Sequence, residues 1–443
     1  MVMSRVFARR DSKIKVSATG DSLITRPVSV YQDMEPLRNL IKEAHVRFTN
    51  CEALFHHGEN YPMASPFAAG TKLMAKPSTA GDLKWIGFNL ASLCNNHTMD
   101  FGEKVMFSTM QALEQNDIIH AGTGRDLDEA KEPRYLETSN GRVALIAAAW
   151  SDFQQPWERA SNMKAGVAAR PGINLLRVNT THTVNVQQFT ILRDLIPVLG
   201  LDPPKGTKTR HKKDEIVFLG HHFRIGDRVG TTKNINKEDL DDIINTVVDA
   251  RKTADWVFVS FHTHDSEGKG AEFPSMFVRD FARACIHAGA DAFLGHGAHI
   301  LQGIEIYERK PIFYSLGNFI IQDEPVDKVS YDQYEAFGLD EHAKPSDFFS
   351  ARHGLMPPSL LPYAKWWFES AVALFELDDE GLEWLKLYPT TMNYETRNKA
   401  QRGRPQIDTS SKGKATLERL AQLSSEFSTK IMVGDKFATI DLP

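Results

Sequence analysis

Four histidines stand at the ends of two apolar segments near the middle of the chain. His262 and His264 follow WVFVSF, which begins at Trp256, and His296 and His299 follow DAFLG. Both segments have the apolar character of buried strands and break off into small and polar residues. Open α/β sheets bind ligands at such strand ends, and neutral imidazoles gathered there can hold a metal ion. The spacing therefore predicts a metal site.

Three further polar residues stand at the ends of other predicted strands. Asp21 follows IKVSATG, Glu52 follows VRFTNC, and Asn96 follows FNLASLCN. Carboxylates, a carboxamide and imidazoles form a ligand mixture suited to Zn, Mn or Fe, and a shared carboxylate can bridge two ions. We expect one or two divalent transition-metal ions on six ligands: Asp21, Glu52, Asn96, His262, His296 and His299. Taken singly, each histidine could also be an ordinary polar residue, and Asp21 could close a turn.

The elements that position these residues alternate between strand and helix over the first 150 residues. Strand patterns at 14–20, 46–50 and 88–93 are separated by segments with the apolar spacing of helices. Such alternation predicts a layered α/β core. Asn140-Gly141 is a strong hairpin signal after this region, and Asn236 is the predicted N-cap of a helix.

Two irregular segments interrupt the alternation. Residues 151–213 contain scattered basic residues, and residues 321–363 are rich in aromatic residues. We interpret both as insertions that wall the site and set substrate choice. The aromatic segment could be a packed lid or a stacking platform, and the lid is favoured.

Composition limits the class of protein. The 443 residues are 42% hydrophobic and 25% charged, as in an ordinary soluble globular protein. A net charge of -5 with scattered basic residues argues against a nucleic-acid partner. Three cysteines are too few for a disulfide framework. The N-terminus lacks the apolar region of a signal peptide, and no run of about 18 apolar residues is present to form a membrane anchor, so a cytoplasmic location is expected.

Seven segments together resemble the motifs of the CapA family of poly-gamma-glutamate synthesis proteins, a divergent branch of the calcineurin-like metallophosphoesterases. They stand in the family's order: GDSL at Gly20, NCEALF at Asn50, CNNHTMDFG at Cys94, AGTG at Ala121, RPGIN at Arg170, GADAFLGHGAHILQGIEIY at Gly289 and PIFYSLGNF at Pro311. RGRPQID near Arg402 resembles the family's late C-terminal stretch. The resemblance implies one domain over 12–430, a metallophosphoesterase-like core of mixed β-sheets flanked by helices, and a C-terminal tail at 431–443.

The resemblance also implies individual roles. Asp21 matches the aspartate of the first phosphoesterase motif, and Glu52 occupies the position of the metal-bridging aspartate. The remaining matches are an asparagine ligand and an acid histidine at Asn96 and His97, a lone histidine ligand at His262, and paired histidines at His296 and His299. His97 is thus a catalytic candidate.

Two positions depart from the family pattern. Leu23 stands where the first motif has a histidine, and His264 stands where many members have glycine. His264 could supply the missing ligand or face the substrate, and it is the second catalytic candidate. Arg170 and Asn174, in RPGIN, could anchor a loop or bind an acidic group of the substrate.

The expected function is a metal-dependent hydrolase that uses a metal-activated water on a small, anionic substrate. The phosphoesterase resemblance favours a phosphoester, and the link to a gamma-linked polymer favours an amide or ester bond. The alternative is a non-hydrolytic subunit for synthesis or export of poly-gamma-glutamate or another capsule polymer. Family members in that role typically carry an N-terminal membrane anchor, which is not expected here.

Overall fold

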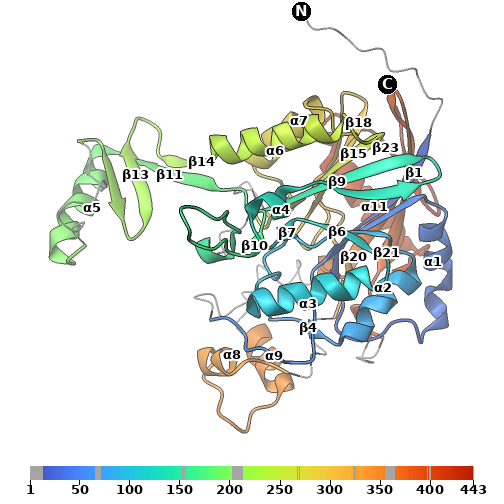
Figure 1. Cartoon of the computed structure of the whole chain (residues 1–443), viewed down its shortest axis with the longest axis horizontal. Coiled ribbons are helices and arrows are strands. Elements are labelled where there is room, and N and C mark those ends of the chain that lie inside the picture. The colour runs from blue at the N-terminus through green and yellow to red at the C-terminus, as the bar shows by residue number, and fades with distance from the viewer. Residues whose placement is uncertain are drawn as a thin grey trace, which may run out of the picture. The chain divides into compact units, whose positions relative to one another are not determined.

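The computed structural model describes residues 13–64, 71–150, 155–201, 213–266, 268, 270–322, 326, 328–354, 365–396, 398 and 401–442. The chain divides into two compact units, which Figure 1 draws as one ribbon. One unit is Leu176–Asp242, and the main unit comprises Met1–Leu175 and Ile243–Pro443. All candidate site residues belong to the main unit.

The larger sheet of the main unit has ten strands. Its order is β23-β24-β21-β20-β1-β2-β5-β6, with β19 beside β1 and β22 beside β21. β1 runs parallel to β2 and β19 but antiparallel to β20, so the sheet is mixed. The strands are β1 (Ile14–Leu23), β2 (Val46–Cys51), β5 (Leu90–Ser92), β6 (Ile119–Ala121), β19 (Asn318–Ile321), β20 (Glu369–Asp378), β21 (Gly381–Thr391), β22 (Gln406–Ile407), β23 (Ile431–Val433) and β24 (Ala438–Ile440).

The smaller sheet has six strands in the order β17-β18-β16-β15-β9-β8. β15 runs parallel to both β9 and β16. Every residue of β15 is buried, as expected for an apolar strand covered on both faces. The strands are β8 (Arg134–Thr138), β9 (Gly141–Ala149), β15 (Trp256–His262), β16 (Ala292–His296), β17 (Ile304–Tyr307) and β18 (Lys310–Phe313).

The two sheets share one apolar core. Val16 and Phe48 of the larger sheet belong to the same buried cluster as Leu145, Phe258 and Leu294 of the smaller sheet. Helices flank the sheets, with α3 against β6 and α7 against β16 (Figure 1). The helices of this unit are α1 (Glu35–Lys42), α2 (Ala80–Ile86), α3 (Gly102–Glu114), α4 (Leu127–Lys131), α7 (Met276–His287), α8 (Tyr331–Ala336), α9 (Pro345–Gly354) and α11 (Ser411–Ser425), with short 3-10 turns at Gln32–Met34, Pro77–Thr79 and Pro156–Glu158. The predicted mixed α/β architecture is confirmed.

Two short pairings, one parallel and one antiparallel, complete the main unit. β3 (Leu54–Phe55) pairs with β4 (Met74–Ala75), and β7 (Thr123–Gly124) pairs with β10 (Gly172–Ile173). The second pairing ties the RPGIN segment to the main unit, although the sequence placed that segment in an insertion at 151–213. The smaller unit instead begins at Leu176, because β10 bonds to the core before that point.

Two other segments singled out in the sequence, 321–363 and 431–443, belong to the main unit. The described part of 321–363 forms α8 and α9, and Phe348 and Phe349 lie in a buried apolar cluster with Leu23 and Leu73. Phe348 and Phe349 are therefore packed, whereas Tyr331 is exposed, and a lid role for this segment stays a prediction. Residues 323–325, 327 and 355–363 lie outside the described residues. The expected tail at 431–443 contributes β23 and β24, which join the large sheet through β21.

The smaller unit has its own sheet and core. Its strand order is β12-β13-β11-β14, with bounds β11 (Val178–Val184), β12 (Glu215–Phe218), β13 (His221–Ile225) and β14 (Gly230–Ile235). α5 (Val186–Val198) begins with a capping box in which Asn185 and Gln188 bond reciprocally. Phe189, Ile196 and Ile216 form its buried cluster. α6 (Lys237–Ala250) begins in this unit and continues into the main unit.

Candidate metal centre

Strand ends from both sheets of the main unit supply the candidate ligands. In β1, the hydrogen-bond register shifts between Ala18 and Asp21, a bulge that re-aims the chain beside the site. The turn at Gly317 approaches so closely that a Cβ on Gly20 would lie 1.8 Å from Gly317 O. Asp21 N donates to that same oxygen at 3.1 Å. This close approach fixes the direction of the Asp21 side chain.

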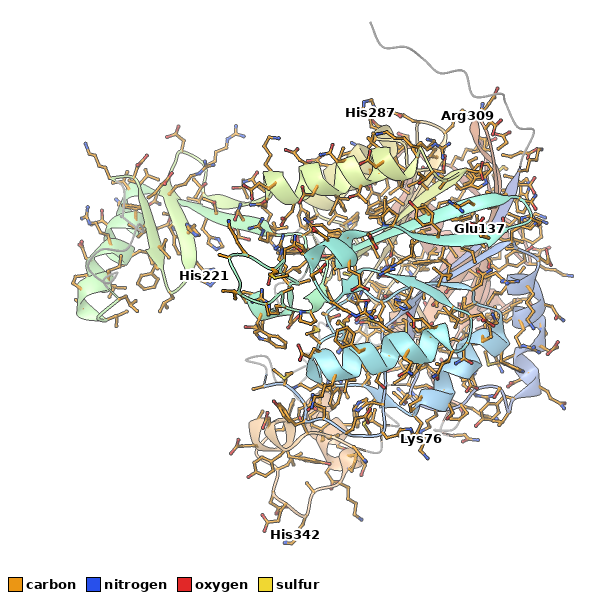
Figure 2. The ribbon with its side chains drawn as sticks, viewed as in Figure 1. Lys76, Glu137, His221, His287, Arg309 and His342 are labelled. Carbon is orange, nitrogen blue, oxygen red and sulfur yellow. The ribbon has the colours of Figure 1, made fainter. Side chains whose placement is uncertain are left out.

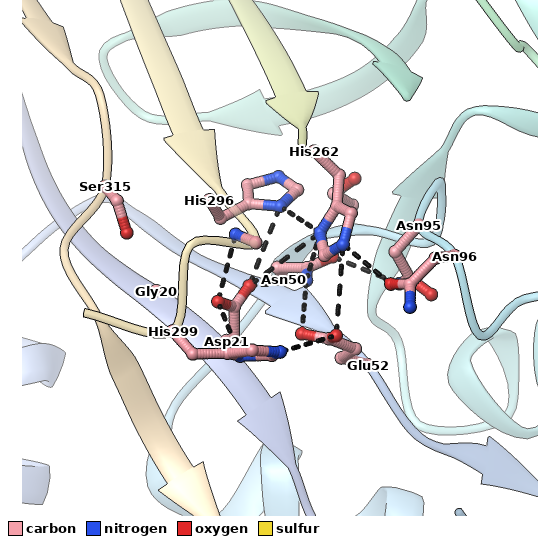
Figure 3. A network of polar contacts seen from close by, with 12 residues as sticks. Gly20, Asp21, Asn50, Glu52, Asn95, Asn96, His262, His296, His299 and Ser315 are labelled. Carbon is pink, nitrogen blue, oxygen red and sulfur yellow. Dashed lines mark hydrogen bonds and ion pairs between the residues drawn. The ribbon is translucent and has the colours of Figure 1, made fainter. Parts of the chain in front are cut away.

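The first ligand group is Asp21, His262 and His296, all fully buried (Figure 3). Oδ1 of Asp21 lies 3.9 Å from Nδ1 of His262 and 3.7 Å from Nδ1 of His296. The two ring nitrogens are 2.9 Å apart. The parallel register explains their meeting, because β15 and β16 pair His262 directly with His296. Ligand atoms around one ion with bonds of about 2 Å are separated by similar distances.

The second group is Glu52, His264 and His299. Oε1 of Glu52 lies 3.7 Å from Nε2 of His299 and 3.9 Å from Nε2 of His262 (Figure 3). Nδ1 of His299 lies 2.8 Å from Oδ1 of Asn318, so it donates there and leaves Nε2 as an acceptor facing Glu52. The ring of His264 packs edge to face against that of His299, with centroids 5.1 Å apart.

Asn50, at the end of β2, links the two groups. Its Nδ2 donates to Oδ1 of Asp21 at 2.8 Å and lies 3.3 Å from both Oε2 of Glu52 and Nδ1 of His262. One amide group has only two hydrogens for these three acceptors. Oε1 of Glu52 is buried without a hydrogen-bond partner among the described residues. Burying an ionised carboxylate oxygen without a partner is costly, and either a proton or a cation on the carboxylate relieves that cost.

The pKa shifts of the two carboxyl groups also bear on whether the cluster can hold a cation. Burial and the nearby charge of Asp21 raise the pKa of Glu52 well above its usual value. Burial acts to raise the pKa of Asp21, but the neighbouring His299 side chain acts the other way, and the pKa of Asp21 is lowered.

The histidines cannot neutralise these carboxylates by protonation. Burial lowers the pKa of His264 to about 3 and that of His296 to about 4, and burial with the charge of His296 holds the pKa of His262 well below its usual value. The imidazoles are therefore neutral near pH 7, the state that binds metal. Two buried carboxylates facing neutral imidazoles fit a divalent cation.

His97 stands beside these groups with a carboxylate partner. Its Nδ1 donates to Oδ2 of Asp100 at 2.7 Å, and its Nε2 lies 3.8 Å from Oε1 of Glu52. Asn95 shapes the turn that presents it, because Oδ1 of Asn95 accepts from His97 N at 3.1 Å. Asn96, in contrast, places its Oδ1 2.8 Å from Nε2 of His262 (Figure 3).

The departure at Leu23 has a packing reason. Leu23 is 6% exposed and belongs to the apolar cluster with Phe348 and Phe349 of α9. A side chain at this position is therefore surrounded by apolar residues. His264 lies apart from that cluster, grouped with Glu52.

Arg170 and Asn174 make hydrogen bonds typical of loop anchors. Both Nε and Nη2 of Arg170 donate to the carbonyl of Arg159, at 3.0 and 2.9 Å. Asn174 is 2% exposed and donates from Nδ2 to Ala147 O at 2.9 Å. These bonds account for the side chains structurally, and a substrate-binding role stays a prediction.

His287 and the three cysteines are not among the grouped ligands. His287, at the end of α7, is exposed and lies 3.1 Å from Glu308 (Figure 2). Cys51, Cys94 and Cys285 are all buried and free.

Sequence reasoning missed Asn50, Asp100 and Asn318 as parts of the site. Asn50 ends a predicted strand, and Asp100 follows His97 by three residues, the spacing that lets a short turn join them. These signals were present in the motifs at Asn50 and Cys94. Asn318 lies in PIFYSLGNF, but its place opposite Asp21 depends on the parallel pairing of β19 with β1.

The chain matches the family model described as "Bacterial capsule synthesis protein PGA_cap" over residues 15–323. This range is more than half of the chain. The chain belongs to this family. The family membership predicted from the motifs is thus confirmed, and every candidate ligand of this PGA_cap protein lies inside the matched range.

Some of the similar curated proteins are uncharacterized, and others are named for capsule or PGA biosynthesis. The uncharacterized protein y4sH of Sinorhizobium fredii is 33% identical over 435 residues, which are 96% of this chain and 92% of that protein. The capsule biosynthesis protein CapA of Bacillus anthracis is 24% identical over 334 residues, 70% of this chain and 61% of that protein. The PGA biosynthesis protein CapA of Bacillus subtilis is 24% identical over 329 residues, 71% and 65% of the two chains.

A solved structure of a hypothetical protein from Thermus thermophilus has a TM-score of 0.38 and 12% identity, covering 85% of this PGA_cap protein and 98% of that chain. Among the described residues, no helix is both long enough and apolar enough to span a membrane.

Proposed function

We propose that this protein serves in making or exporting a capsule-type polymer such as poly-gamma-glutamate, and that its metal centre hydrolyses a small anionic substrate. The polymer role rests on the printed names of the CapA relatives. The names favour it over a free-standing hydrolase. The hydrolytic chemistry rests chiefly on one observation: the buried Oε1 of Glu52 has no hydrogen-bond partner among the described residues and faces two imidazole nitrogens.

Two ligand groups support a centre for one or two ions. Asp21, His262 and His296 would hold one ion, and Glu52, His264 and His299 a second. His264 then takes the place of the histidine that Leu23 replaces, and Asn96 would be a further oxygen ligand of the cluster. When bound, such ions supply Lewis-acid activation of water and of the bond under attack.

The side chain of His97 would protonate the leaving group. Asp100 holds Nδ1, so the free Nε2 is the atom that transfers the proton. Nε2 lies 3.8 Å from Oε1 of Glu52, which puts the proton beside the ligand groups. Asp100 acts as a positioning residue through His97.

The bond cleaved is either a phosphoester or an amide or ester. Both electrophiles suit the same centre, because each develops negative charge on oxygen in the transition state. A non-hydrolytic role in polymer assembly is the second candidate, because the names of the CapA relatives state a biosynthetic role and mention no hydrolysis.

Metal analysis joined to an activity screen tests the proposal. The purified protein, incubated with Mn or Zn and desalted, should carry one or two ions per chain. It should cleave at least one class among phosphomonoesters, phosphodiesters, esters and amides. Glu52→Ala should lose both ions together, while Glu59→Ala, on an exposed side chain of the same segment, should keep them.

The outcomes separate the two candidates. Less than about a tenth of an ion per chain would refute the metal centre. Full metal content without cleavage of any class would refute hydrolysis and leave the assembly role.

A further inference from the structure

His299 has an unusual backbone conformation for a candidate metal ligand. Its φ is +59°, in the left-handed region that residues other than glycine seldom adopt. Its side chain is 20% exposed, whereas those of His262 and His296 are fully buried. The ring still has a set direction, with Nδ1 3.6 Å from Oδ2 of Asp21 and Nε2 3.7 Å from Oε1 of Glu52 (Figure 3). Contacts other than burial must therefore hold the turn and the ring.

Asn318, the first residue of β19, makes these contacts from a fully buried position. Its Nδ2 donates to the carbonyl of His299 at 3.2 Å and to the carbonyl of Trp367 at 3.0 Å. Its Oδ1 lies 2.8 Å from Nδ1 of His299. One side chain therefore contacts both the ring and the backbone of His299.

The two carbonyls decide the tautomer of His299. Carbonyl oxygens only accept, so the amide atom of Asn318 that faces both of them is the nitrogen. The atom that faces the ring is then the oxygen, which also only accepts, so Nδ1 of His299 carries the proton. Nε2 is left as an acceptor on the side of Glu52. An imidazole in this form binds a metal ion through Nε2.

The first ligand group is oriented by a different residue. Oγ of Ser260 lies 2.7 Å from Nε2 of His296, and Nδ1 of that ring lies 3.7 Å from Oδ1 of Asp21. Ser260 belongs to β15 and Asn318 to β19, which are strands of different sheets. A change of the Asn318 side chain therefore acts on the second group without removing the hydrogen bond between Ser260 and His296.

We propose that Asn318 is a positioning residue for one ion of a two-ion centre. It holds the turn at His299 and sets Nε2 of that histidine as the ligand atom. This inference rests on the metal centre of the proposed function. The ring of His299 is grouped with Glu52 and His264. Loss of the Asn318 amide should therefore weaken the ion of that group and spare the ion of the first group.

Metal titrations test this assignment without requiring turnover. The metal-free protein is titrated with Mn or Zn against a chelator, and the bound ions are counted at each step. Asn318→Leu, close in size but without polar side-chain atoms, should weaken one ion about 10 to 100-fold and leave the other unchanged. Ser260→Ala should weaken the other ion. His299→Ala should weaken the same ion as Asn318→Leu, and adding Asn318→Leu to it should cause little further loss.

Asn89→Leu is the matched control for Asn318→Leu. Asn89 is also a buried asparagine, and it accepts from the backbone of Arg47 and donates to the backbone of His45 just before β5. Its loss should lower the melting temperature and keep the affinities for both ions.

The tautomer of His299 is measured by nitrogen NMR of the metal-free protein labelled at histidine, at pH 8. The resonances of His299 are those absent from His299→Gln. The wild type should show the proton on Nδ1. Asn318→Asp, which keeps an acceptor for Nδ1, should keep that tautomer, whereas Asn318→Leu should move the population toward a proton on Nε2. A purely structural role of Asn318 would not produce this difference.

Three results would overturn the inference. One is a proton on Nε2 of His299 in the wild type, a result that requires no change at Asn318. Another is wild-type affinity for every ion in Asn318→Leu, whether the wild type holds one ion or two. The third is equal weakening of both ions, because Asn318 would then support the whole centre through β19. Failure of the proposed function is separate, since it appears as a wild-type protein that binds no ion or cleaves no substrate.

Discussion

At the scale of single residues, the site has two buried carboxyl groups and too few hydrogen-bond donors to satisfy both of them. Asp21 and Glu52 are fully buried, and the imidazoles of His262, His264 and His296 are neutral near pH 7 because their pKa values are lowered. Asn50 supplies the nearest donor group and leaves Oε1 of Glu52 without a partner among the described residues. The raised pKa of Glu52 means that its ionised form is costly here, and a bound cation would stabilise that form.

His97→Ala should retain metal while kcat falls roughly 10² to 10⁴-fold, the usual contribution of a positioned general acid. Asp100→Asn should lower kcat less and also retain metal, because it removes only the group that orients Nδ1. The double variant should be no slower than His97→Ala alone, since both changes act on one proton transfer. Metal analysis and steady-state kinetics provide the measurement. Loss of metal in step with activity would make His97 a ligand instead.

Glu158 should make stability fall as pH rises. Burial raises the pKa of its carboxyl group to about 8. Below pH 4.5 both folded and unfolded states hold the proton; between 4.5 and 8 only the folded state does, so unfolding is increasingly favoured as pH rises. Glu158→Gln keeps an acceptor for Gln155 N and removes this dependence. It should match the wild type at pH 4.5 and exceed it by roughly 5 kcal/mol at pH 8.5.

Urea unfolding at the two pH values measures this difference. Glu103→Gln, on an exposed side chain of α3, is the control and should behave as the wild type at both. Equal stabilities of Glu158→Gln and the wild type at pH 8.5 would show that Glu158 ionises normally in the folded protein.

At the scale of elements, the site depends on the contact between β1 and the turn before β19. Gly20→Ala would place a Cβ 1.8 Å from Gly317 O, which is backbone and cannot rotate away. Unfolding free energy should drop by about 2 to 4 kcal/mol, as for overpacked core positions. Metal content should drop as well, because Asp21 is the next residue.

Gly354→Ala provides the comparison. Among the described residues other than its chain neighbours, no heavy atom lies within 4 Å of a Cβ at this position at the end of α9. Chemical denaturation and elemental analysis should show no loss in this variant. A Gly20→Ala protein as stable and as metal-rich as Gly354→Ala would mean that the turn can shift without moving Asp21.

At the scale of the whole molecule, the smaller unit should be dispensable for metal binding. It contains none of the candidate ligands, and its apolar cluster consists of its own residues. Its two ends are adjacent, since Asn236 N donates to Arg177 O at 2.8 Å and Val178 pairs with Ile235. Replacing residues 178–235 with a two-residue Gly linker should therefore leave the main unit folded and metal-bound.

Elemental analysis and thermal unfolding of this shortened chain measure the outcome. His296→Ala in the same background should lose metal and shows that retention depends on the centre. A shortened chain that folds but holds no ion would assign the smaller unit a part in the metal site.

Much of the architecture was accessible from the sequence because it depends on local patterns. The hairpin predicted at Asn140-Gly141 is formed by β8 and β9. The apolar run from Trp256 could be identified as a buried strand because strands covered on both faces are continuously apolar. Motif order, which survives divergence, indicated the family.

Other features depend on contacts between segments distant in sequence, and local patterns do not encode them. Leu23 is buried under Phe348, more than three hundred positions away, and His264 is grouped with Glu52. The end of the chain looked like a tail, yet it adds two strands to the large sheet.

By itself, the sequence determined the α/β class, the family and the residue types of the metal centre, because these follow from periodicity, motif order and ligand chemistry. Only the tertiary structure decided which candidate ligands belong to each of the two groups. Strand register places His262 opposite His296, and the packing of separate loops brings His264 and His299 to Glu52. Those distances are set by how whole sheets and loops pack together, and no spacing along the chain specifies them.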